Sequence, residues 1–345
     1  MTARTLSFTG PRTVEVCSRP IPDPGPTDVR VRTRVSAVSA GTEGLIYRGE
    51  APADLPADSE LDALEGDLSF PLTYGYAAVG EVDAVGSEVD DDWLGRAVFA
   101  YNAHESHFLA TPDDLLPVPE EVTPREAALF ANLETAVTFL LDGEPLVGEH
   151  VAVFGQGVVG LLTTALLART PIETLVTFDP DGDRRQHADA FGADHTFDPT
   201  ACAVEEAFAD AATVAGTGDE SPRADLSYEL SGNPNALDDA LAVTGFDGRL
   251  LVGSWYGDKP ATANLGGRFH RDRIDIRSTQ VSTIDPRLSG RWSRERRHEL
   301  TWSWLRRLDL ERLFTHEFPL EDAGTAYELL EERADGVVQV LFTYE

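Results

Sequence analysis

Cysteine and lysine are almost absent from this sequence of 345 residues, which has two cysteines, Cys17 and Cys202, and a single lysine, Lys259. Two cysteines exclude a disulfide framework, and they also exclude a structural zinc lobe built from four cysteine ligands. The first ten residues lack the basic end and the following apolar block of a signal peptide. We therefore expect a cytoplasmic protein without structural disulfides.

Basic residues are scarce as a class, since 28 arginines and lysines face 60 aspartates and glutamates and leave a formal net charge of −32. Nucleic acid is excluded as a partner, because a phosphate backbone binds to net basic surface. So large a negative charge repels itself in dilute salt, but it is screened when the Debye length falls to about 3 Å near about 1 M salt. We therefore expect a protein adapted to a high-salt cytoplasm.

The segment over residues 268–312 departs from this acidic composition. It has twelve arginines against seven acidic residues, a local excess of five positive charges. Ion pairs with the acidic remainder of the chain, or with a second subunit, are one explanation. Recognition of an anionic substrate by arginine side chains is the other.

Glycine is concentrated at one place, directly after an apolar strand-like run over residues 151–154 and before an apolar helical run over residues 161–168. The residues between these runs are Gly155, Gln156, Gly157, Val158, Val159 and Gly160. A strand that stops at a glycine turn and resumes as a helix directs unpaired N–H groups and the positive end of the helix toward phosphate. The motif predicts a pyrophosphate site, and a purely structural glycine turn is the alternative.

An acidic residue follows the glycine motif at the spacing that dinucleotide-binding proteins use. Asp179 lies 19 residues after Gly160 and directly follows the strand-like residues 174–178. A carboxylate there accepts hydrogen bonds from an adenosine ribose and repels a 2′-phosphate, which favours NAD over NADP. Arg184 and Arg185 keep NADP as the alternative.

The uncharged stretch over residues 151–168 is long enough to suggest a membrane span. Three glycines and Gln156 interrupt it, and Arg169 is the only basic residue close to either end. The order of strand, glycine turn, helix, strand and aspartate fits a nucleotide-binding fold instead. We therefore expect no membrane partner.

The periodicity of apolar residues changes along the chain, whose length suits two domains. Residues 29–37 alternate small or apolar residues with arginine or serine, as half-buried strands do, and further strands fit residues 77–85 and 96–101. Beyond residue 124 strands alternate with helices, which predicts a parallel, doubly wound sheet. The predicted strands are 151–154, 174–178, 195–197, 225–230, 248–253 and 274–282, and the predicted helices are 158–169, 183–191, 203–214 and 234–243. A strand, a helix and a strand follow over residues 314–345.

A nucleotide-binding fold with β structure before it and a short return after it resembles the medium-chain dehydrogenase/reductase family, which includes the zinc-type alcohol dehydrogenases. The resemblance covers nearly the whole chain and rests on several short motifs. They are the proline-rich residues 21–26, Ala40-Gly41-Thr42-Glu43, residues 75–82, the glycine motif, Ser231-Gly232-Asn233 and residues 247–252. The resemblance implies an α/β protein with a GroES-like β-barrel catalytic domain and a Rossmann domain with a doubly wound parallel sheet.

The resemblance also implies a domain division and a cofactor site. The catalytic domain is expected over residues 1–131, the NAD(P)-binding Rossmann domain over residues 132–285, and the return that completes the catalytic domain over residues 286–345. The nicotinamide is expected near Thr135, Ser231 and Gly253. Family likeness further suggests a homodimer that pairs the last strand of the Rossmann domain, near residues 274–281.

Zinc members of this family hold their catalytic metal with a cysteine before a Gly-Thr-Asp motif, a histidine in a Gly-His-Glu triplet, and a third ligand just before the nucleotide domain. In this sequence the corresponding positions are Ala40, Tyr76 and about Ala131. None of them offers the cysteine, histidine or carboxylate donors that a catalytic zinc requires. We therefore expect an enzyme that works without zinc or another metal.

Hydride chemistry without zinc still needs a group that polarises the substrate oxygen and passes a proton. Tyr76 replaces the metal-binding histidine, and Thr42 matches the hydroxyl that passes a proton in zinc members. His104 and His107, three residues apart, are further candidates for substrate contact. A metal pair and a plain surface position are the alternatives for the two histidines, and a packed ring is the alternative for Tyr76.

The predicted function is that of an NAD(P)-dependent oxidoreductase that transfers hydride between nicotinamide and a secondary alcohol or ketone. Within the family, residues 39–43 and Gly75-Tyr76 resemble the branch that contains bacteriochlorophyllide a dehydrogenase, which suggests a bulky or anionic small-molecule substrate. Quinone or enone reduction is an alternative that also dispenses with zinc. A protein that binds the dinucleotide without catalysis is the alternative from a different class.

Overall fold

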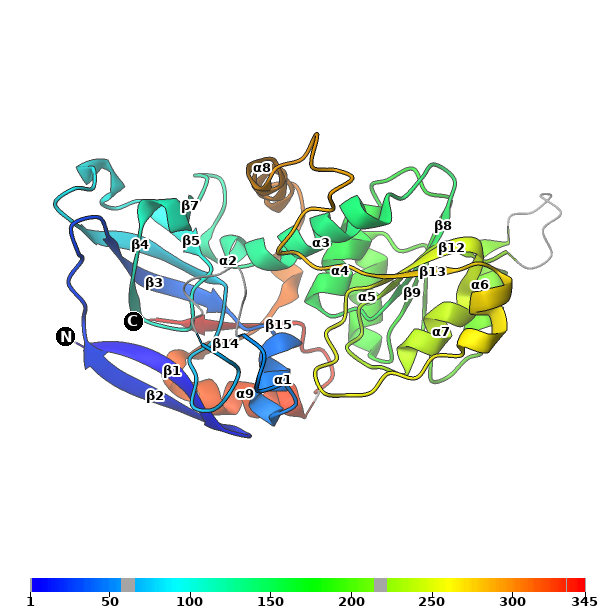
Figure 1. Ribbon diagram of the computed structural model, residues 1–345, viewed down its shortest axis with the longest axis horizontal. Coiled ribbons are helices and arrows are strands. Elements are labelled where there is room, and N and C mark those ends of the chain that lie inside the picture. Colours follow the sequence, from blue (N-terminus) through cyan, green and yellow to red (C-terminus); the bar gives the residue numbers. More distant parts are fainter. Residues whose placement is uncertain (1, 57–65, 214–221, 333, 345) are drawn as a thin grey trace. The chain divides into compact units, whose positions relative to one another are not determined.

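The structure, a computed structural model, describes residues 2–56, 66–213, 222–332 and 334–344. The chain divides into two compact units (Figure 1). Unit 1 comprises Met1–Ala131 and Trp302–Glu345, and unit 2 comprises Asn132–Thr301. Residues 286–301, which lie beyond the expected end of the Rossmann domain at residue 285, thus group with unit 2.

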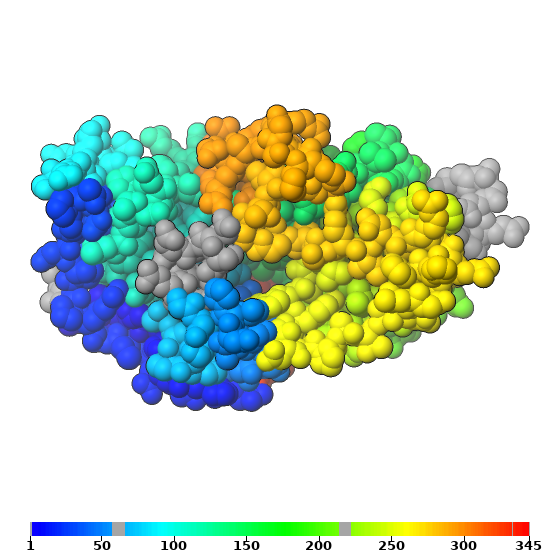
Figure 2. All heavy atoms as spheres, in the orientation of Figure 1, coloured from blue at the N-terminus to red at the C-terminus, as the bar shows by residue number. Residues whose placement is uncertain are grey.

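Unit 1 is built mainly from antiparallel β structure. A seven-stranded sheet has the order β14-β15-β3-β4-β5-β7, with β6 paired to β3, and only the β14-β15 pair is parallel within this described sheet. Its strands are β3 (Val29–Ala37), β4 (Ala78–Val85), β5 (Ala97–Ala100), β6 (His107–Ala110), β7 (Leu115–Pro117), β14 (Phe314–Pro319) and β15 (Gln339–Thr343). A separate hairpin pairs β1 (Thr2–Gly10) with β2 (Thr13–Pro20), and Figure 2 shows it in dark blue at the surface.

The alternation along β3 follows from the two environments of its faces. Its valines are buried, whereas the arginines between them reach across to acidic residues on β4. Arg30 Nε lies 2.7 Å from Asp83 Oδ1, and Arg34 contacts Glu81 at 2.9 Å. Cross-strand ion pairs of this kind keep the arginine face exposed and the valine face inside, which fixes the register of the strand.

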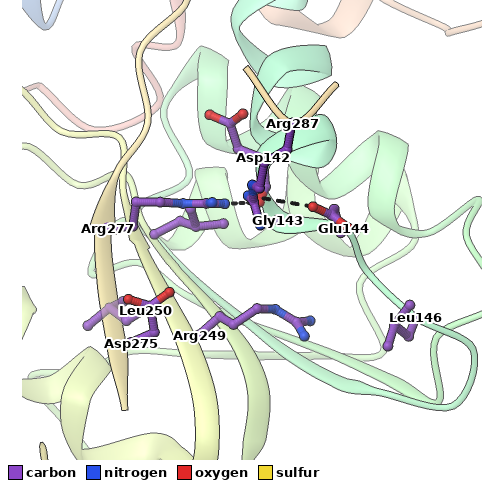
Figure 3. A pocket seen from close by; sticks show the side chains of 10 residues that line it. Asp142, Gly143, Glu144, Leu146, Arg249, Leu250, Asp275, Arg277 and Arg287 are labelled. Carbon is purple, nitrogen blue, oxygen red and sulfur yellow. Dashed lines mark hydrogen bonds and ion pairs between the residues drawn. The ribbon is translucent and has the colours of Figure 1, made fainter. Parts of the chain in front are cut away.

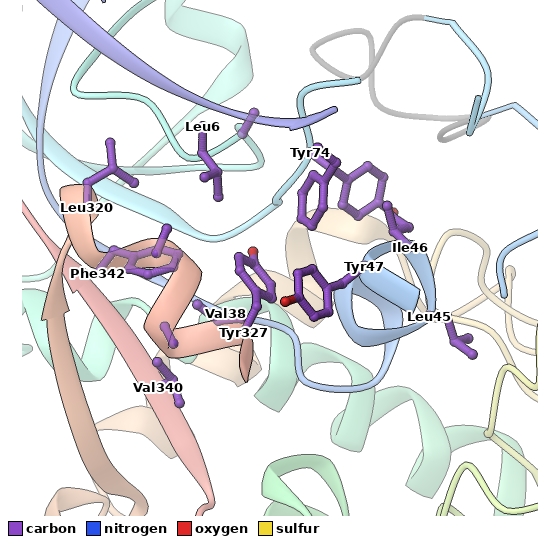
Figure 4. Close-up of a cluster of buried hydrophobic side chains, with 14 of the residues drawn as sticks. Leu6, Val38, Leu45, Ile46, Tyr47, Tyr74, Leu320, Tyr327, Val340 and Phe342 are labelled. Atoms are coloured by element: carbon purple, nitrogen blue, oxygen red, sulfur yellow. The ribbon is translucent and has the colours of Figure 1, made fainter. Parts of the chain in front are cut away.

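Short helices close one side of unit 1 around a core of apolar and tyrosine side chains (Figure 4). Tyr47 and Tyr327 stack there with ring centroids 5.2 Å apart. They belong to α1 (Thr42–Arg48) and α9 (Ala323–Glu331). The unit also contains α2 (Pro124–Ala127) and the 3₁₀ turns η2 (Asp91–Trp93), η3 (Pro112–Asp114), η5 (Glu311–Leu313) and η6 (Leu320–Asp322).

Unit 2 is built on a parallel sheet of six strands in the order β10-β9-β8-β11-β12-β13. The strands are β8 (His150–Phe154), β9 (Thr174–Phe178), β10 (His195–Phe197), β11 (Ala224–Glu229), β12 (Thr244–Val252) and β13 (Asp275–Ser278). In sequence order this is the 3-2-1-4-5-6 arrangement of dinucleotide-binding proteins. The order reverses between β8 and β11, which is where such sheets bind their ligands.

Helices cover both faces of this sheet, as the apolar residues of β8 show. Val151 and Val153 pack in one cluster with residues of α3 and α4, and Ala152 and Phe154 pack in another with residues of α6 and α7. The helices of unit 2 are α4 (Val158–Leu167), α5 (Gly182–Phe191), α6 (Val204–Ala212) and α7 (Ala236–Val243), with α3 (Phe130–Gly143) and α8 (Arg294–Leu305) at its two ends and η4 (Leu265–Phe269) before β13. The predicted doubly wound α/β fold is confirmed.

Three details differ from, or add to, the sequence expectations. The strand expected over residues 274–282 ends as β13 at Ser278. Beyond this end, the Thr279 backbone N–H still donates to the Val252 carbonyl of β12 at 3.0 Å, and its hydroxyl donates to Asp142 at 2.5 Å. Helix α8 was not expected from the sequence, because its charged residues lie in its first half and its apolar residues in its second half, which gives no helical periodicity. No helix in the described ranges is long and apolar enough to cross a membrane.

Candidate functional site

The glycine motif forms the turn between β8 and α4. Gly155 has a φ of 92°, which side-chain-bearing residues rarely adopt, and a Cβ on it would lie 2.5 Å from the Cα of Ser231. A Cβ on Gly160 would lie 2.0 Å from the carbonyl oxygen of Gly155. A Cβ on Gly157, the N-cap of α4, would meet nothing within 4 Å. The fold itself requires Gly155 and Gly160, whereas Gly157 borders open space.

The N-terminus of α4 directs backbone groups toward that space. The helix begins at Val158, and the first N–H groups of a helix, here those around Val159, have no acceptor within the helix. The side chain of Gln156 turns inward, because its amide donates to the Gly155 carbonyl at 3.1 Å and its oxygen accepts the Thr164 hydroxyl at 3.0 Å. Bare backbone and the positive helix end therefore face outward, an arrangement that suits a phosphate group.

Asp179 follows β9 and folds onto the glycine turn. One carboxylate oxygen accepts the backbone N–H of Gln156 at 2.6 Å, and the other accepts that of Asp181 at 2.9 Å. The residue is 4% exposed, and this burial raises the pKa of its carboxyl above the ordinary value despite the two hydrogen bonds. Each oxygen retains a second lone pair, so the carboxylate can accept further donors.

The two arginines of the expected cofactor site lie beside Asp179 in the first turn of α5. Arg184 Nε is 3.6 Å from a carboxylate oxygen of Asp181. The Arg185 guanidinium donates to the carbonyl oxygens of Asp179 and Pro180 at 2.7 and 2.8 Å. Both arginines place positive charge next to the Asp179 carboxylate. Their ion pairs within the described residues are with Asp181 and Asp198.

Ser231 and Gly253 lie at the same edge of the sheet as the glycine turn. Ser231 follows β11, and the N–H of Gly253, after β12, donates to the Glu229 carbonyl at 3.0 Å. A Cβ on Gly253 would lie 2.5 Å from the ring of Phe139. Thr135 is half-buried on α3. The structure therefore brings Gly155, Ser231 and Gly253 to the carboxyl ends of adjacent strands.

Sequence reasoning missed a buried carboxylate at this edge. Glu229, the last residue of β11, is fully buried and accepts both the backbone N–H and the hydroxyl of Ser231. Tyr256 donates to its other oxygen at 2.5 Å. Burial, followed by the Glu229 charge, raises the pKa of the Tyr256 hydroxyl, which therefore stays protonated. The sequence carries no clear signal for this residue, because β11 also contains Asp225 and Ser227.

The expected catalytic hydroxyls lie in unit 1. Thr42 is half-buried and begins α1, directly after the turn that follows β3. Tyr76 is half-buried, and its hydroxyl donates to Ser39 Oγ at 2.5 Å. Ser39 belongs to the same turn as Thr42. Both hydroxyls therefore depend on one short segment, residues 38–42, for their position.

The two expected histidines have separate surroundings. His104 is fully buried, with Nε2 2.9 Å from Glu43 Oε2 and Nδ1 2.7 Å from Ser36 Oγ. His107 lies on β6, where Nδ1 is 3.2 Å from Ser106 Oγ and Nε2 is 4.0 Å from Asp83. Burial lowers the pKa of His107 below its ordinary value. The structure does not bring the two rings onto a common partner.

The positions that hold zinc in related enzymes do not fit a metal ion in this chain. Ala40 and Ala131 carry no ligating atom, and the Tyr76 hydroxyl is a hydrogen-bond donor to Ser39. Over residues 2–56, 66–213, 222–332 and 334–344, no group of three or more histidine, cysteine, aspartate or glutamate side chains is arranged to hold a metal.

A pocket of about 160 Å³ lies in another part of unit 2 (Figure 3). Its charged lining includes Arg249, Arg277 and Arg287. Arg249 pairs with Glu149 at 2.7 Å, and the other two arginines contact Asp285 at 3.4 and 2.8 Å. The Arg287 hydrogen bonds lower the pKa of the Asp285 carboxyl to about 2. No lining residue belongs to the expected cofactor site.

Many arginines of the basic segment over residues 268–312 form ion pairs within the chain. The pairs with acidic residues at 4.0 Å or less involve Arg268, Arg273, Arg277, Arg287, Arg297, Arg306 and Arg312. Arg297 and Glu134 are both buried and lie 2.7 Å apart. Arg296 and Arg307 lie over tryptophan rings instead. These contacts favour ion pairing within the chain, rather than recognition of an anionic substrate, as the explanation for the arginines of residues 268–312.

Comparison with known proteins adds three findings. The sequence pattern of the zinc-binding dehydrogenase family matches residues 158–293. Two curated relatives are similar along most of their length. D-guloside 3-dehydrogenase of Escherichia coli K12 is 24% identical over 290 residues, which are 81% of each chain. L-threonine 3-dehydrogenase of Xanthomonas oryzae is 22% identical over 349 residues, which are 92% of this chain and 93% of that protein. A short chain alcohol dehydrogenase of Escherichia coli CFT073, solved with NADH, superimposes with a TM-score of 0.79 at 18% identity over 99% of both chains. The chain therefore has the medium-chain dehydrogenase fold.

Proposed function

We propose that this chain, an alcohol dehydrogenase-like oxidoreductase of the medium-chain zinc-binding dehydrogenase family, uses NAD(P) to transfer hydride to or from a secondary alcohol or ketone. The observation that carries the proposal is the glycine turn over residues 155–160, with Asp179 folded onto it. The family match over residues 158–293 begins at the first residue of α4 and covers the whole helix and the strands from β9 to β13. The NADH complex of the structural neighbour supports a nicotinamide cofactor.

The residues of unit 2 suit the cofactor in distinct ways. The backbone of residues 155–160 would hold the pyrophosphate, with Gly157 leaving the space for its approach. Asp179 would accept the adenosine ribose hydroxyls on its remaining lone pairs, which favours NAD. Arg184 keeps NADP as the alternative. The bound nicotinamide supplies the hydride acceptor or donor, and Thr135, Ser231 and Gly253 would line its site.

Protein hydroxyls take the place of the metal in this proposal. On substrate binding, Tyr76 would turn its single hydroxyl proton from Ser39 Oγ to the substrate oxygen, and its own oxygen would then accept the Ser39 O–H. The new hydrogen bond would stabilise the charge on the substrate oxygen as it changes between alkoxide and carbonyl. Thr42 would pass the proton to or from the same oxygen. The replacement of zinc ligands by Ala40 and Tyr76 supports a reaction that runs without zinc.

The relatives and the ion pairs of the chain each bear on the proposed substrate class. Two curated relatives are named for dehydrogenation of a guloside and of threonine, which supports an alcohol as the substrate. Resemblance to the bacteriochlorophyllide branch adds a bulky or anionic alcohol to the candidates. The ion pairs of residues 268–312 occupy most of the arginines that would otherwise bind an anion, which favours a neutral substrate.

The test is a screen of alcohols, ketones, enones and quinones with NAD(H) and NADP(H), in strong KCl and with a chelator present. The proposal expects a change at the absorbance band of reduced nicotinamide with a secondary alcohol or ketone. Turnover confined to enones or quinones would favour the reductase alternative. Cofactor binding without turnover of any compound would favour a non-catalytic dinucleotide-binding protein.

Two further proposals concern the assembly and its environment. β13 pairs only with β12 among the described strands, so its outer edge carries unpaired N–H and C=O groups, which supports a homodimer formed there. Molar mass from light scattering in strong KCl tests the dimer.

The net charge of −32 supports function in a high-salt cytoplasm.

A further inference from the structure

A buried chain of polar groups runs through the interior of unit 1. Tyr344 Oη lies 2.7 Å from Ser36 Oγ, which lies 2.7 Å from His104 Nδ1, and His104 Nε2 lies 2.9 Å from Glu43 Oε2. Ser36, His104 and Glu43 are 0% exposed, and Tyr344 is 9% exposed. A buried polar network of this kind is costly unless each member is satisfied, so its complete pairing indicates a specific role.

The partners assign a direction to these hydrogen bonds. Glu43 as a carboxylate can only accept, so His104 Nε2 carries the proton that faces it. Within the described chain the Tyr344 hydroxyl has Ser36 as its hydrogen-bond partner, and Tyr344 therefore donates to Ser36, which donates to His104 Nδ1. Burial raises the pKa of Tyr344, which keeps this hydroxyl available as a donor.

The Glu43 carboxylate receives two more donors besides His104. Its Oε1 accepts the backbone N–H of Ser39 at 2.8 Å, and the Tyr327 hydroxyl donates to its Oε2. Burial and the Glu43 charge raise the pKa of Tyr327 well above the ordinary value, so Tyr327 remains a donor. Figure 4 shows Tyr327 projecting from α9 into this part of the core. Three donors satisfy a charge that would otherwise be expensive to bury.

The buried polar network holds both ends of the turn between β3 and α1. Ser36 is the next-to-last residue of β3, and Glu43 is the second residue of α1. His104 bridges them, and Glu43 also holds the backbone of Ser39 between them. The Ser39 hydroxyl is the acceptor of the Tyr76 O–H at 2.5 Å. The position of the Tyr76 hydroxyl therefore depends on the network through Ser39.

His104 also restricts the position of the Tyr76 backbone, because its ring packs against the preceding residue. Gly75, the residue before Tyr76, has a φ of 127°, and a Cβ on it would lie 2.9 Å from two ring atoms of His104. The imidazole thus packs directly on the segment that carries Tyr76. A shift of this ring would move the Tyr76 backbone as well as the acceptor of its hydroxyl.

We infer that Glu43 and His104 are positioning residues for Tyr76, which they hold through the Ser39 turn and the Gly75 backbone. The inference rests on the proposed function of Tyr76 as hydrogen-bond donor to the substrate. Ser36, His104 and Glu43 have the connectivity of a nucleophile, a base and an orienting acid. The full burial of Ser36 excludes a substrate from it, so the network acts on Tyr76 rather than on a second reaction.

The first test follows the protons of His104 by ¹⁵N NMR of the histidine-labelled, full-length protein. The wild type is expected to carry its proton on Nε2. In Glu43→Gln, the side-chain NH₂ would face His104, and the proton is expected to move to Nδ1 so that Nε2 accepts. The same tautomer in both proteins would overturn the inference. Thr244→Val, which removes a buried hydroxyl in unit 2 that bonds Ser227 at 2.8 Å, is the matched control and should change nothing.

The second test measures Tyr76 directly, by ¹³C NMR of ring-labelled tyrosine with Tyr76→Phe identifying its signal. Glu43→Gln and the milder Ser36→Ala are expected to shift the Tyr76 signal in the direction that Ser39→Ala does, whereas Thr244→Val does not. An unmoved Tyr76 signal in the folded variants would overturn the inference. This readout needs no turnover, so it decides the inference even if the proposed function fails.

The third test uses kinetics once a substrate is known. Glu43→Gln and Ser39→Ala are each expected to lower kcat by about 10-fold while the cofactor Kd stays unchanged. Because both act through one turn, the double variant should be no slower than the more damaged single variant. Losses that multiply in the double variant would show that Glu43 acts independently of Ser39, and would contradict the inference while leaving the dehydrogenase proposal intact.

Discussion

The carboxylate of Asp179 accepts the backbone N–H of Gln156, inside the glycine turn, at 2.6 Å. The contact ties the end of β9 to the segment that separates β8 from α4. It also means that Asp179 has two tasks in the proposed enzyme, since the same carboxylate holds the turn and faces the expected ribose. Its substitution should therefore disturb cofactor binding more than the loss of one ribose hydrogen bond would.

Asp179→Asn tests this double role. Asparagine offers one oxygen and one NH₂ group, so either Gln156 or Asp181 loses its acceptor. We expect the Kd for NAD to rise by about 10-fold or more, equivalent to about 1.4 kcal/mol, in calorimetric titrations. Asp194→Asn is the control, because Asp194 accepts a backbone N–H from Leu175 at 2.8 Å but lies outside the expected site. Equal affinities in all three proteins would contradict the assignment.

Gly157→Ala separates the cofactor site from the fold. The added Cβ meets no protein atom within 4 Å, so the thermal midpoint should fall by no more than a few degrees. The same methyl would stand where the pyrophosphate approaches, and we expect the Kd for NAD to rise by about 10-fold or more. Gly324→Ala, also in open space, should leave the affinity unchanged. A Gly157→Ala protein that binds NAD normally would show that the pyrophosphate lies elsewhere.

Tyr76→Phe and Thr42→Val test the hydroxyls that replace the metal. Each variant keeps its shape and loses one hydroxyl, so the fold and the cofactor Kd should be preserved. We expect kcat to fall by about 100-fold in each, the usual contribution of a positioned proton donor or acceptor. Steady-state kinetics with the substrate found by screening measures the effect. Full activity in both variants would remove the hydroxyls from the mechanism.

His107 predicts a pH dependence of stability. Burial lowers its pKa below the ordinary 6.5 in the folded protein, so the unfolded chain binds the proton more readily. Stability contributed by the neutral ring is present above pH 6.5 and is lost as the pH falls through the folded pKa. Thermal unfolding from pH 7.5 to pH 5, about the range in which histidine titrates, should show the loss. His107→Gln should reduce this loss, and the exposed His195→Gln should not. An equal pH dependence in His107→Gln would refute the argument.

The net charge of −32 predicts a strong salt requirement. Raising KCl from about 0.1 M to about 2 M shortens the Debye length below the spacing of most surface charges and should raise the thermal midpoint steeply. Sucrose at matched osmolality, which screens no charge, should have a smaller effect. A midpoint that ignores KCl would count against adaptation to high salt.

Much of the fold could be predicted because its signals are local. The alternation of residues 29–37 gave β3 its correct ends, and the glycine motif located the start of α4 at Val158. Helix α8 escaped prediction for a physical reason. Its buried Arg297 is satisfied by Glu134 and Thr138, 163 and 159 residues earlier, and such partners cannot be seen in a local pattern.

The candidate site likewise has a part that local sequence patterns predict and a part that depends on residues far apart in the sequence. Gly157 and Asp179 could be found from spacing alone, because strand, turn and helix are consecutive. The surroundings of His104 could not, since its partners Ser36 and Glu43 are 68 and 61 residues away and meet it only in the folded β structure. The sequence suggested a substrate contact for His104, and the structure adds two buried neighbours at its ring nitrogens.

The most direct test of a metal-free hydride-transferring enzyme is the turnover number of protein whose zinc content has been measured on the same sample. The account predicts full turnover with NAD or NADP in strong KCl at less than about 0.1 zinc per chain, with no gain when zinc is restored. Turnover that rises in proportion to bound zinc, up to one ion per chain, would contradict it.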